Sequence, residues 1–155
     1  MLRIIFISLM ILFTLFGCKK EEAAKLTSLG DQAYEEGYIW SSIKYYKQAL
    51  DMIPSDDEKW CKLGISYATV KQYEDAAKCF QKAYNLKPNN PKYFHLQAEV
   101  LNAVGAFKEA LGFMDKSCQM GYTRACSRML EIVSENSNRT YGLQVPPPSM
   151  ESFFR

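Results

Sequence analysis

The sequence predicts an all-α protein in which three helix-turn-helix repeats stack into one superhelix and a further helix caps the end. A period of about 34 residues brings three segments of the chain into register. Within each segment the apolar residues follow the turn of a helix. Proline and glycine residues fall at the ends of these apolar runs, where helices stop. A chain of 155 residues has room for one such domain.

The first residues predict a secretion signal and not a membrane span. After a short basic start, an apolar run covers residues 4–16, which is shorter than the roughly 20 residues that a spanning helix needs. The run ends in Leu-Phe-Gly-Cys at residues 15–18, which resembles a bacterial lipobox. The resemblance implies a signal peptide over 1–17, lipidation of Cys18 and a lipidated tether over 18–22. An ordinary signal with a chance cysteine is the alternative.

The residues after Cys18 bear on the destination of the protein. The position directly after Cys18 is Lys19, without the aspartate that is associated with inner-membrane retention. The resemblance to lipoproteins therefore implies a lipid anchor in the outer membrane, with the domain facing the periplasm. Residues 19–22, Lys-Lys-Glu-Glu, are also similar to surface-export signals, so exposure at the cell surface is an alternative. Several acyl chains would make the anchoring effectively permanent.

The middle segment, residues 57–90, has the clearest repeat pattern. It reads Trp60-x-x-Leu63-Gly64-x-x-Tyr67, then Ala76-x-x-x-Phe80, Ala83 and Pro88. The first four positions share one face of a first helix, and the next three form the facing side of a second helix. Pro88 ends that second helix. The pattern closely resembles the tetratricopeptide motif, which implies a right-handed superhelix of helical hairpins.

The neighbouring segments repeat the pattern less completely. The first repeat covers residues 23–56 and the third covers 91–122, where several motif positions are replaced. Ser55 followed by Glu58 forms a capping-box pattern for the middle repeat. Asn90 and Pro91 offer an N-cap and a first-turn proline for the third.

A capping helix and a tail complete the predicted chain. Gly121 suits a helix C-cap, and a capping helix is predicted over 123–135, which closes the tetratricopeptide domain at residues 23–136. Residues 137–155 contain three consecutive prolines and are predicted to be a disordered tail.

The cysteines predict a disulfide and no metal site. The stretch around Cys118 and Cys126 resembles the bridged hairpins of secreted Sel1-like cysteine-rich repeat proteins, which implies a disulfide between them. Two buried thiols are the alternative. Cys61 and Cys79 fall on different helices, where their side chains should diverge, and no bridge is expected. With one histidine and no paired CxxC, the sequence predicts no zinc site.

The tetratricopeptide resemblance implies a concave groove that binds a protein or peptide partner. The groove positions are Asp31, Tyr34, Glu35, Tyr38, Ile65, Thr69, Gln72, His95, Glu99 and Asn102. Tyr34 and Tyr38 are the candidate hot spots, because aromatic rings dominate binding energy. Packing of these rings against the neighbouring helix is the alternative.

Further features of the sequence argue against several classes of function. Thr27, Asp31 and Lys62 stand where chaperone adaptors carry the Lys and Asn that hold a C-terminal carboxylate, so that activity is not carried over. The net charge is +2 and basic residues alternate with acidic ones, which disfavours nucleic acid. No nucleophile or metal motif accompanies His95, and no glycine loop for phosphate occurs, so neither catalysis nor a cofactor is expected.

The sequence therefore predicts a non-catalytic adaptor of the bacterial cell envelope, anchored by lipid and binding another protein. The alternative is a Sel1-like cysteine-rich secreted protein that binds or acts on cell-wall fragments around His95 and Glu99.

Overall fold

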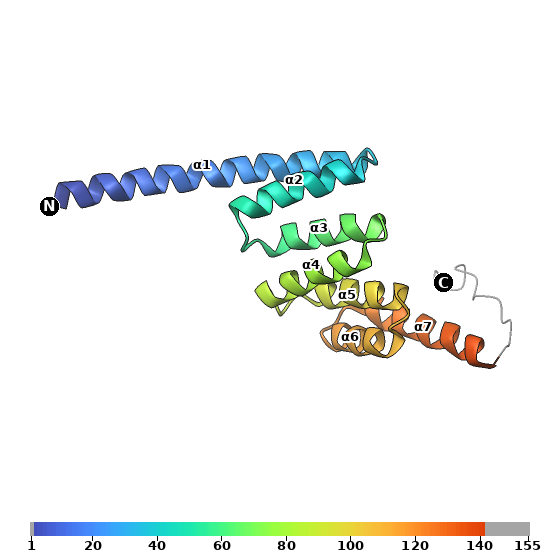
Figure 1. The fold of residues 1–155 in the computed structure, drawn as a ribbon. Helices are drawn as coiled ribbons and strands as arrows, with labels where there is room; N and C mark the ends of the chain where they lie inside the picture. Colours follow the sequence, from blue (N-terminus) through green and yellow to red (C-terminus); the bar gives the residue numbers. More distant parts are fainter. Residues whose placement is uncertain (1, 142–155) are drawn as a thin grey trace, which may run out of the picture.

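The computed structural model describes the backbone of residues 2–141, with the side chains of residue 17 and residues 19–136. Over this range all regular secondary structure is α-helical. The helices are α1 (Leu2–Glu35), α2 (Ile39–Met52), α3 (Asp57–Thr69), α4 (Tyr73–Leu86), α5 (Pro91–Ala103), α6 (Phe107–Gln119) and α7 (Thr123–Tyr141). They form three stacked hairpins, α1–α2, α3–α4 and α5–α6, and α7 lies against the last one (Figure 1). The predicted all-α fold is confirmed.

Each hairpin closes where a small residue faces a larger side chain. A Cβ placed at Gly30 would lie 2.6 Å from the ring of Tyr46, and one placed at Gly64 would lie 2.7 Å from the ring of Phe80. These approaches are much shorter than van der Waals contact, so both positions require glycine while the rings stay in place. In the third hairpin Ala98 belongs to one buried cluster with Met114, and both are fully buried.

The turns inside the hairpins share a left-handed residue. Gly37 and Gly105 both have φ 83°, and Lys71 has φ 61° at the corresponding point of the middle hairpin. Glycine adopts this conformation without steric cost, whereas a residue with a Cβ is strained by about 1–2 kcal/mol. Gly121 after α6 has φ 90°, as its predicted role at the helix end requires.

The helix boundaries confirm one predicted cap and correct two predictions. Asn90 accepts a hydrogen bond from the backbone of Lys92 at 3.2 Å, as predicted. For α3 the N-cap is Asp56 and not Ser55, because the Asp56 carboxylate accepts from the backbone of Lys59 and also pairs with its ammonium group. Helix α7 continues to Tyr141 instead of ending at Glu135, since no glycine or proline interrupts the chain before residue 142.

The N-terminal part of the described chain is helical, including the residues predicted to form the lipidated tether. Residues 18–22 lie inside α1, which is continuous with the first repeat. Between residues 2 and 141, no helix combines the length and apolar character needed to cross a membrane. The side chain of Cys18 and the tail beyond residue 141 lie outside the described part of the chain.

Candidate functional site

The odd-numbered helices α1, α3, α5 and α7 form an inner layer, joined by polar contacts between side chains of successive repeats. Each contact pairs a carboxylate on one inner helix with a donor on the next. The pairs are Asp31 with Lys62 (2.8 Å), Asp57 with Tyr93, and Glu99 with Arg128 (3.1 Å). These three contacts link each inner helix to the next one along the stack.

The first repeat contributes the predicted aromatic residues. The Tyr34 hydroxyl lies 3.2 Å from the Thr69 hydroxyl on α3, so this ring bridges two inner helices. Tyr38 lies in the turn after α1 and is 65% exposed. Asp31 accepts hydrogen bonds from Tyr46 (2.7 Å) and Lys62, so its carboxylate is already engaged inside the protein. Of these side chains, Tyr38 is the one most open to a partner.

The middle of the inner layer contains an open cleft of about 560 Å³. Its lining comes from the loop before α3, the loop before α5, α3 as far as Ile65 and the first turn of α5. The lining residues are Ile53, Ser55, Asp56, Asp57, Glu58, Cys61, Lys62, Ile65, Lys87, Asn90, Lys92 and Tyr93. Charges of both signs surround a small apolar floor, which suits a segment that carries polar and apolar side chains.

The cleft includes groups that the predicted groove residues omit. Of the predicted groove residues, Ile65 lines it, whereas Lys92 and Tyr93 were not predicted. The sequence contained a signal for both, since they lie in the first turn of the inner helix that the Asn90-Pro91 start predicts.

The third repeat is more closed than predicted. His95 is 7% exposed; its Nδ1 lies 3.3 Å from the sulfur of Met114, and its ring is 5.2 Å from that of Tyr122. Glu99 lies 3.9 Å from His95 Nε2 and pairs with Arg128 of α7. Helix α7 and the turn before it therefore cover this end of the groove, and His95 is a packed core residue.

The remaining predicted residues lie at the rim. Glu35 and Gln72 are exposed, and Gln72 occupies the N-cap position of α4 without a capping bond from its side chain. Asn102 is half-buried in the last turn of α5. These three residues are not part of the central cleft.

Burial shifts the pKa values of two cysteines and of the histidine toward their neutral forms. Burial raises the pKa of Cys61 to about 11 and that of Cys79 to about 12, so both thiols stay protonated at neutral pH. Burial, together with the charges of Arg124 and Arg128, lowers the pKa of His95, which is therefore neutral at pH 7. Among the described residues, no group of three or more His, Cys, Asp or Glu could hold a metal ion.

A disulfide joins the last hairpin to α7. Cys118 and Cys126 are bonded with a Cα–Cα distance of 4.9 Å, while Cys61 and Cys79 are free and buried in different clusters. The bond holds the start of α7 beside the end of α6, where α7 covers the third repeat.

Comparison with known proteins agrees with the repeat geometry. Residues 57–90 match the family model described as tetratricopeptide repeat. The chain has a tetratricopeptide-repeat fold. The first TPR of Spaghetti (RPAP3), solved bound to the HSP90 peptide SRMEEVD, superposes with a TM-score of 0.71 at 16% identity, over 76% of this chain and 95% of that one.

Two further solved structures have the same tetratricopeptide fold. The Sgt2 TPR domain from Aspergillus fumigatus has a TM-score of 0.70 at 23% identity, and the alignment covers 83% of this chain and 87% of that one. The type III secretion translocator chaperone SycD of Yersinia enterocolitica has a TM-score of 0.69 at 19% identity, over 74% and 85% of the two chains.

Sequence relatives are similar over short segments of larger proteins. Superkiller protein 3 of Saccharomyces cerevisiae is 34% identical over 82 residues, which are 53% of this chain and 6% of the relative. The Hsp70-Hsp90 organising protein of Plasmodium falciparum is 29% identical over 73 residues, 47% of this chain and 29% of the relative. The chain thus spans less than a third of the length of these relatives.

Proposed function

We propose that this protein is a lipid-anchored adaptor of a bacterial cell envelope, which binds an extended segment of a partner protein in its tetratricopeptide groove. The observation that carries the proposal is the open cleft of about 560 Å³ in the inner layer of the repeats. The cleft has the size of a ligand site, and its lining offers charged, hydroxyl and apolar groups together. A tetratricopeptide neighbour solved with a bound peptide supports this use of the fold.

The chemistry of the groove restricts the partner. Lys62 donates to Asp31, so the cation at this position is already neutralised within the groove. Thr27 bonds to the carbonyl of Ala23 on its own helix. A partner recognised mainly by a terminal carboxylate therefore fits poorly. An internal segment with apolar and mixed-charge side chains fits the lining better.

The anchor is proposed from the lipobox resemblance at Cys18. Acyl chains on this residue would hold the domain at a membrane, which we propose to be the outer membrane with the domain facing the periplasm. The Cys118–Cys126 disulfide supports an oxidising compartment of this kind, because such bonds persist mainly outside the cytosol.

The cell-wall alternative gains no support from the geometry. It requires an accessible pair of His95 and Glu99, but His95 is buried and Glu99 is paired with Arg128. A groove that binds protein remains the function that the side-chain arrangement favours.

Replacing Tyr34 and Tyr38 with alanine is expected to abolish recovery of the partner. A hot-spot ring contributes about 2 kcal/mol or more, so removing two of them weakens binding by roughly a thousandfold. The measurement is affinity capture of the full-length protein from detergent-solubilised membranes, followed by mass spectrometry. Trp40→Ala is the matched control, because Trp40 is an aromatic residue of similar exposure (62%) on the outer helix α2. Capture of the same stoichiometric partner by the double variant and also by Ile65→Glu, a change inside the cleft, would contradict the groove assignment.

The variant Cys18→Ser is expected to lose acylation and to leave the membrane-anchored fraction. Mass spectrometry of the N-terminal peptide from the wild type should show a diacylglyceryl thioether and an amide-linked acyl chain on residue 18. Lys19→Ser is the neighbouring control and should keep both modifications. An unmodified thiol on Cys18 in protein purified from membranes would rule out the anchor.

A further inference from the structure

We infer that one edge of the tetratricopeptide domain docks onto the surface of an anionic bilayer. This basal edge consists of the loops at residues 53–56, 87–90 and 120–122 and the helix ends beside them. The inference rests on the proposed acylation of Cys18 and adds a second partner to that function, namely the lipid surface itself.

The helix α1 sets the distance between the anchor and the basal edge. Gly30 on α1 faces Tyr46 on α2, and antiparallel pairing from this contact places Ala23 level with Ile53, where α2 ends. Ala23 is fully buried, and α1 is continuous from there back through Cys18. Five helical residues advance by about 7.5 Å. The basal edge therefore lies within about one Debye length of the anchored residue, the range over which charges on lipid headgroups attract it.

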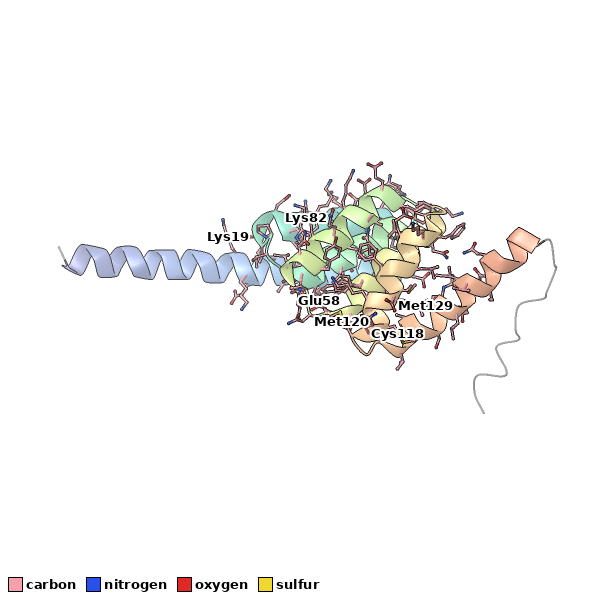
Figure 2. The ribbon with its side chains drawn as sticks, turned by 90° about the horizontal axis from the view of Figure 1, so that it is seen from below. Lys19, Glu58, Lys82, Cys118, Met120 and Met129 are labelled. Atoms are coloured by element: carbon pink, nitrogen blue, oxygen red, sulfur yellow. A yellow bond between two sulfur atoms is a disulfide. The ribbon has the colours of Figure 1, made fainter. Side chains whose placement is uncertain are left out.

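The arrangement of the hairpins also shows which edge of the domain lies nearer to the anchored residue. In Figure 1 the α2–α3 and α4–α5 loops lie at the side from which the N-terminal part of α1 projects, whereas the α1–α2 and α3–α4 turns lie at the other side. Figure 2 shows Lys19 on the projecting helix, with Glu58 and Met120 toward the nearer end of the domain. An anchor on α1 therefore places the basal edge next to the membrane. The opposite edge, which contains the α1–α2 and α3–α4 turns, faces away from it.

The two edges differ in charge. Cations gather on the basal edge and on the adjoining turns of α1; the exposed ones are Lys19, Lys20, Lys25, Lys87, Lys92 and Arg124. The opposite edge carries the exposed carboxylates Glu35, Glu36, Glu74, Asp75 and Glu109, together with Lys44, Lys71, Lys78 and Lys108. Exposed Glu21, Glu22, Asp51 and Glu58 offset part of the basal charge. A net basic edge beside a lipid anchor complements anionic headgroups.

The partners of individual basal side chains strengthen this difference. Asp56 forms an ion pair with Lys59, so its charge is already balanced within the protein, whereas Asp57 accepts a hydrogen bond from Tyr93 and keeps its charge. Lys87 lies 3.8 Å from Asp57 and keeps 60% of its side chain exposed. The apolar side chains of Leu86 (45% exposed) and Met120 (36%) also lie on this edge and can enter the headgroup layer.

The distribution of these exposed cations favours docking on a lipid surface over binding of a protein. Lys87 and Lys92 line the central cleft, but the other exposed cations lie outside it, on α1 and at the start of α7. A flat, fluid array of phosphate groups meets all of them at once, at about 1 kcal/mol for each Lys or Arg near the surface. Such attraction is weak alone, so its role is to orient a domain that the acyl chains already hold.

The test uses acylated protein purified from membranes and reconstituted in vesicles of phosphatidylcholine, with and without about one third phosphatidylglycerol. Backbone hydrogen exchange is measured in the three basal loops. We expect slower exchange on the anionic vesicles and recovery of fast exchange at high salt. Replacing Lys87 and Lys92 with glutamine should lower the ratio of docked to undocked protein by roughly thirtyfold. Replacing Lys44 and Lys108, which removes the same charge from the opposite edge, should leave the loops protected.

Equal exchange on both vesicles, or equal loss of protection in the two double variants, would overturn the inference. The pure lipid system contains no protein partner, so failure to find an adaptor partner does not affect the result. The intact mass of the purified protein reports acylation separately. An unacylated chain that still shows salt-sensitive protection would refute the anchor while supporting the basal edge.

Discussion

Replacing Phe80 with alanine is expected to lower the free energy of unfolding by about 3–5 kcal/mol. Phe80 is 1% exposed, and its ring packs directly over Gly64 inside the middle hairpin. It also belongs to the cluster that contains Tyr93 and Val100 of the next repeat. The substitution therefore leaves a cavity at a contact within one hairpin and between two hairpins.

The size of this loss matters because domains have total stabilities of about 5–15 kcal/mol. Each repeat contacts only its neighbours, so a destabilised middle repeat no longer couples the folding of the first repeat to that of the third. Urea unfolding followed by far-ultraviolet circular dichroism measures the change. Leu130→Ala is the control, since Leu130 is 68% exposed and its truncation should change stability by less than about 0.5 kcal/mol. A Phe80→Ala variant as stable as this control would show that the hairpin is not packed as described.

Replacing Cys118 and Cys126 with serine is expected to cost about 2–3 kcal/mol of stability, because the bond closes a short loop that is otherwise free in the unfolded chain. The loss should be concentrated in α7. Ala125 and Ile132 on this helix are fully buried, so α7 retains apolar contacts without the bond but exchanges its backbone hydrogens faster.

The reduced wild type provides the matched comparison for the disulfide. A thiol reductant should lower the unfolding midpoint of the wild type to that of the double serine variant, and it should not affect the variant itself. A double variant as stable as the oxidised wild type would mean that α7 is held by packing and by the Arg128–Glu99 ion pair alone.

The architecture was predictable because the repeat pattern is local. The spacing of Trp60, Leu63 and Gly64 defines a helix face within one segment, and Phe80 follows at the distance that one hairpin requires. The structure buries Leu63 and Phe80 and packs Trp60 against the cluster that contains Phe80. These contacts arise within one repeat length, so periodicity alone identifies them.

The open part of the groove was less predictable, because neighbouring repeats decide which side chains stay accessible. His95 has the register of a groove residue, but Met114 and Tyr122 cover it from segments further along the chain. Asp31 is likewise engaged by Lys62 of the next repeat. Repeat register gives the direction of a side chain, whereas its exposure depends on the identity of residues one repeat away.

The polar links between successive inner helices have a mechanical consequence. Lys62 with Asp31 and Arg128 with Glu99 are ionic contacts near the surface, and such contacts weaken as dissolved ions screen them. The outer helices are held instead by apolar contacts, such as the rings of Tyr84 and Phe113 at 6.1 Å. Salt therefore weakens the contacts between the inner helices more than those between the outer helices. We expect the curvature of the solenoid to decrease as ionic strength rises.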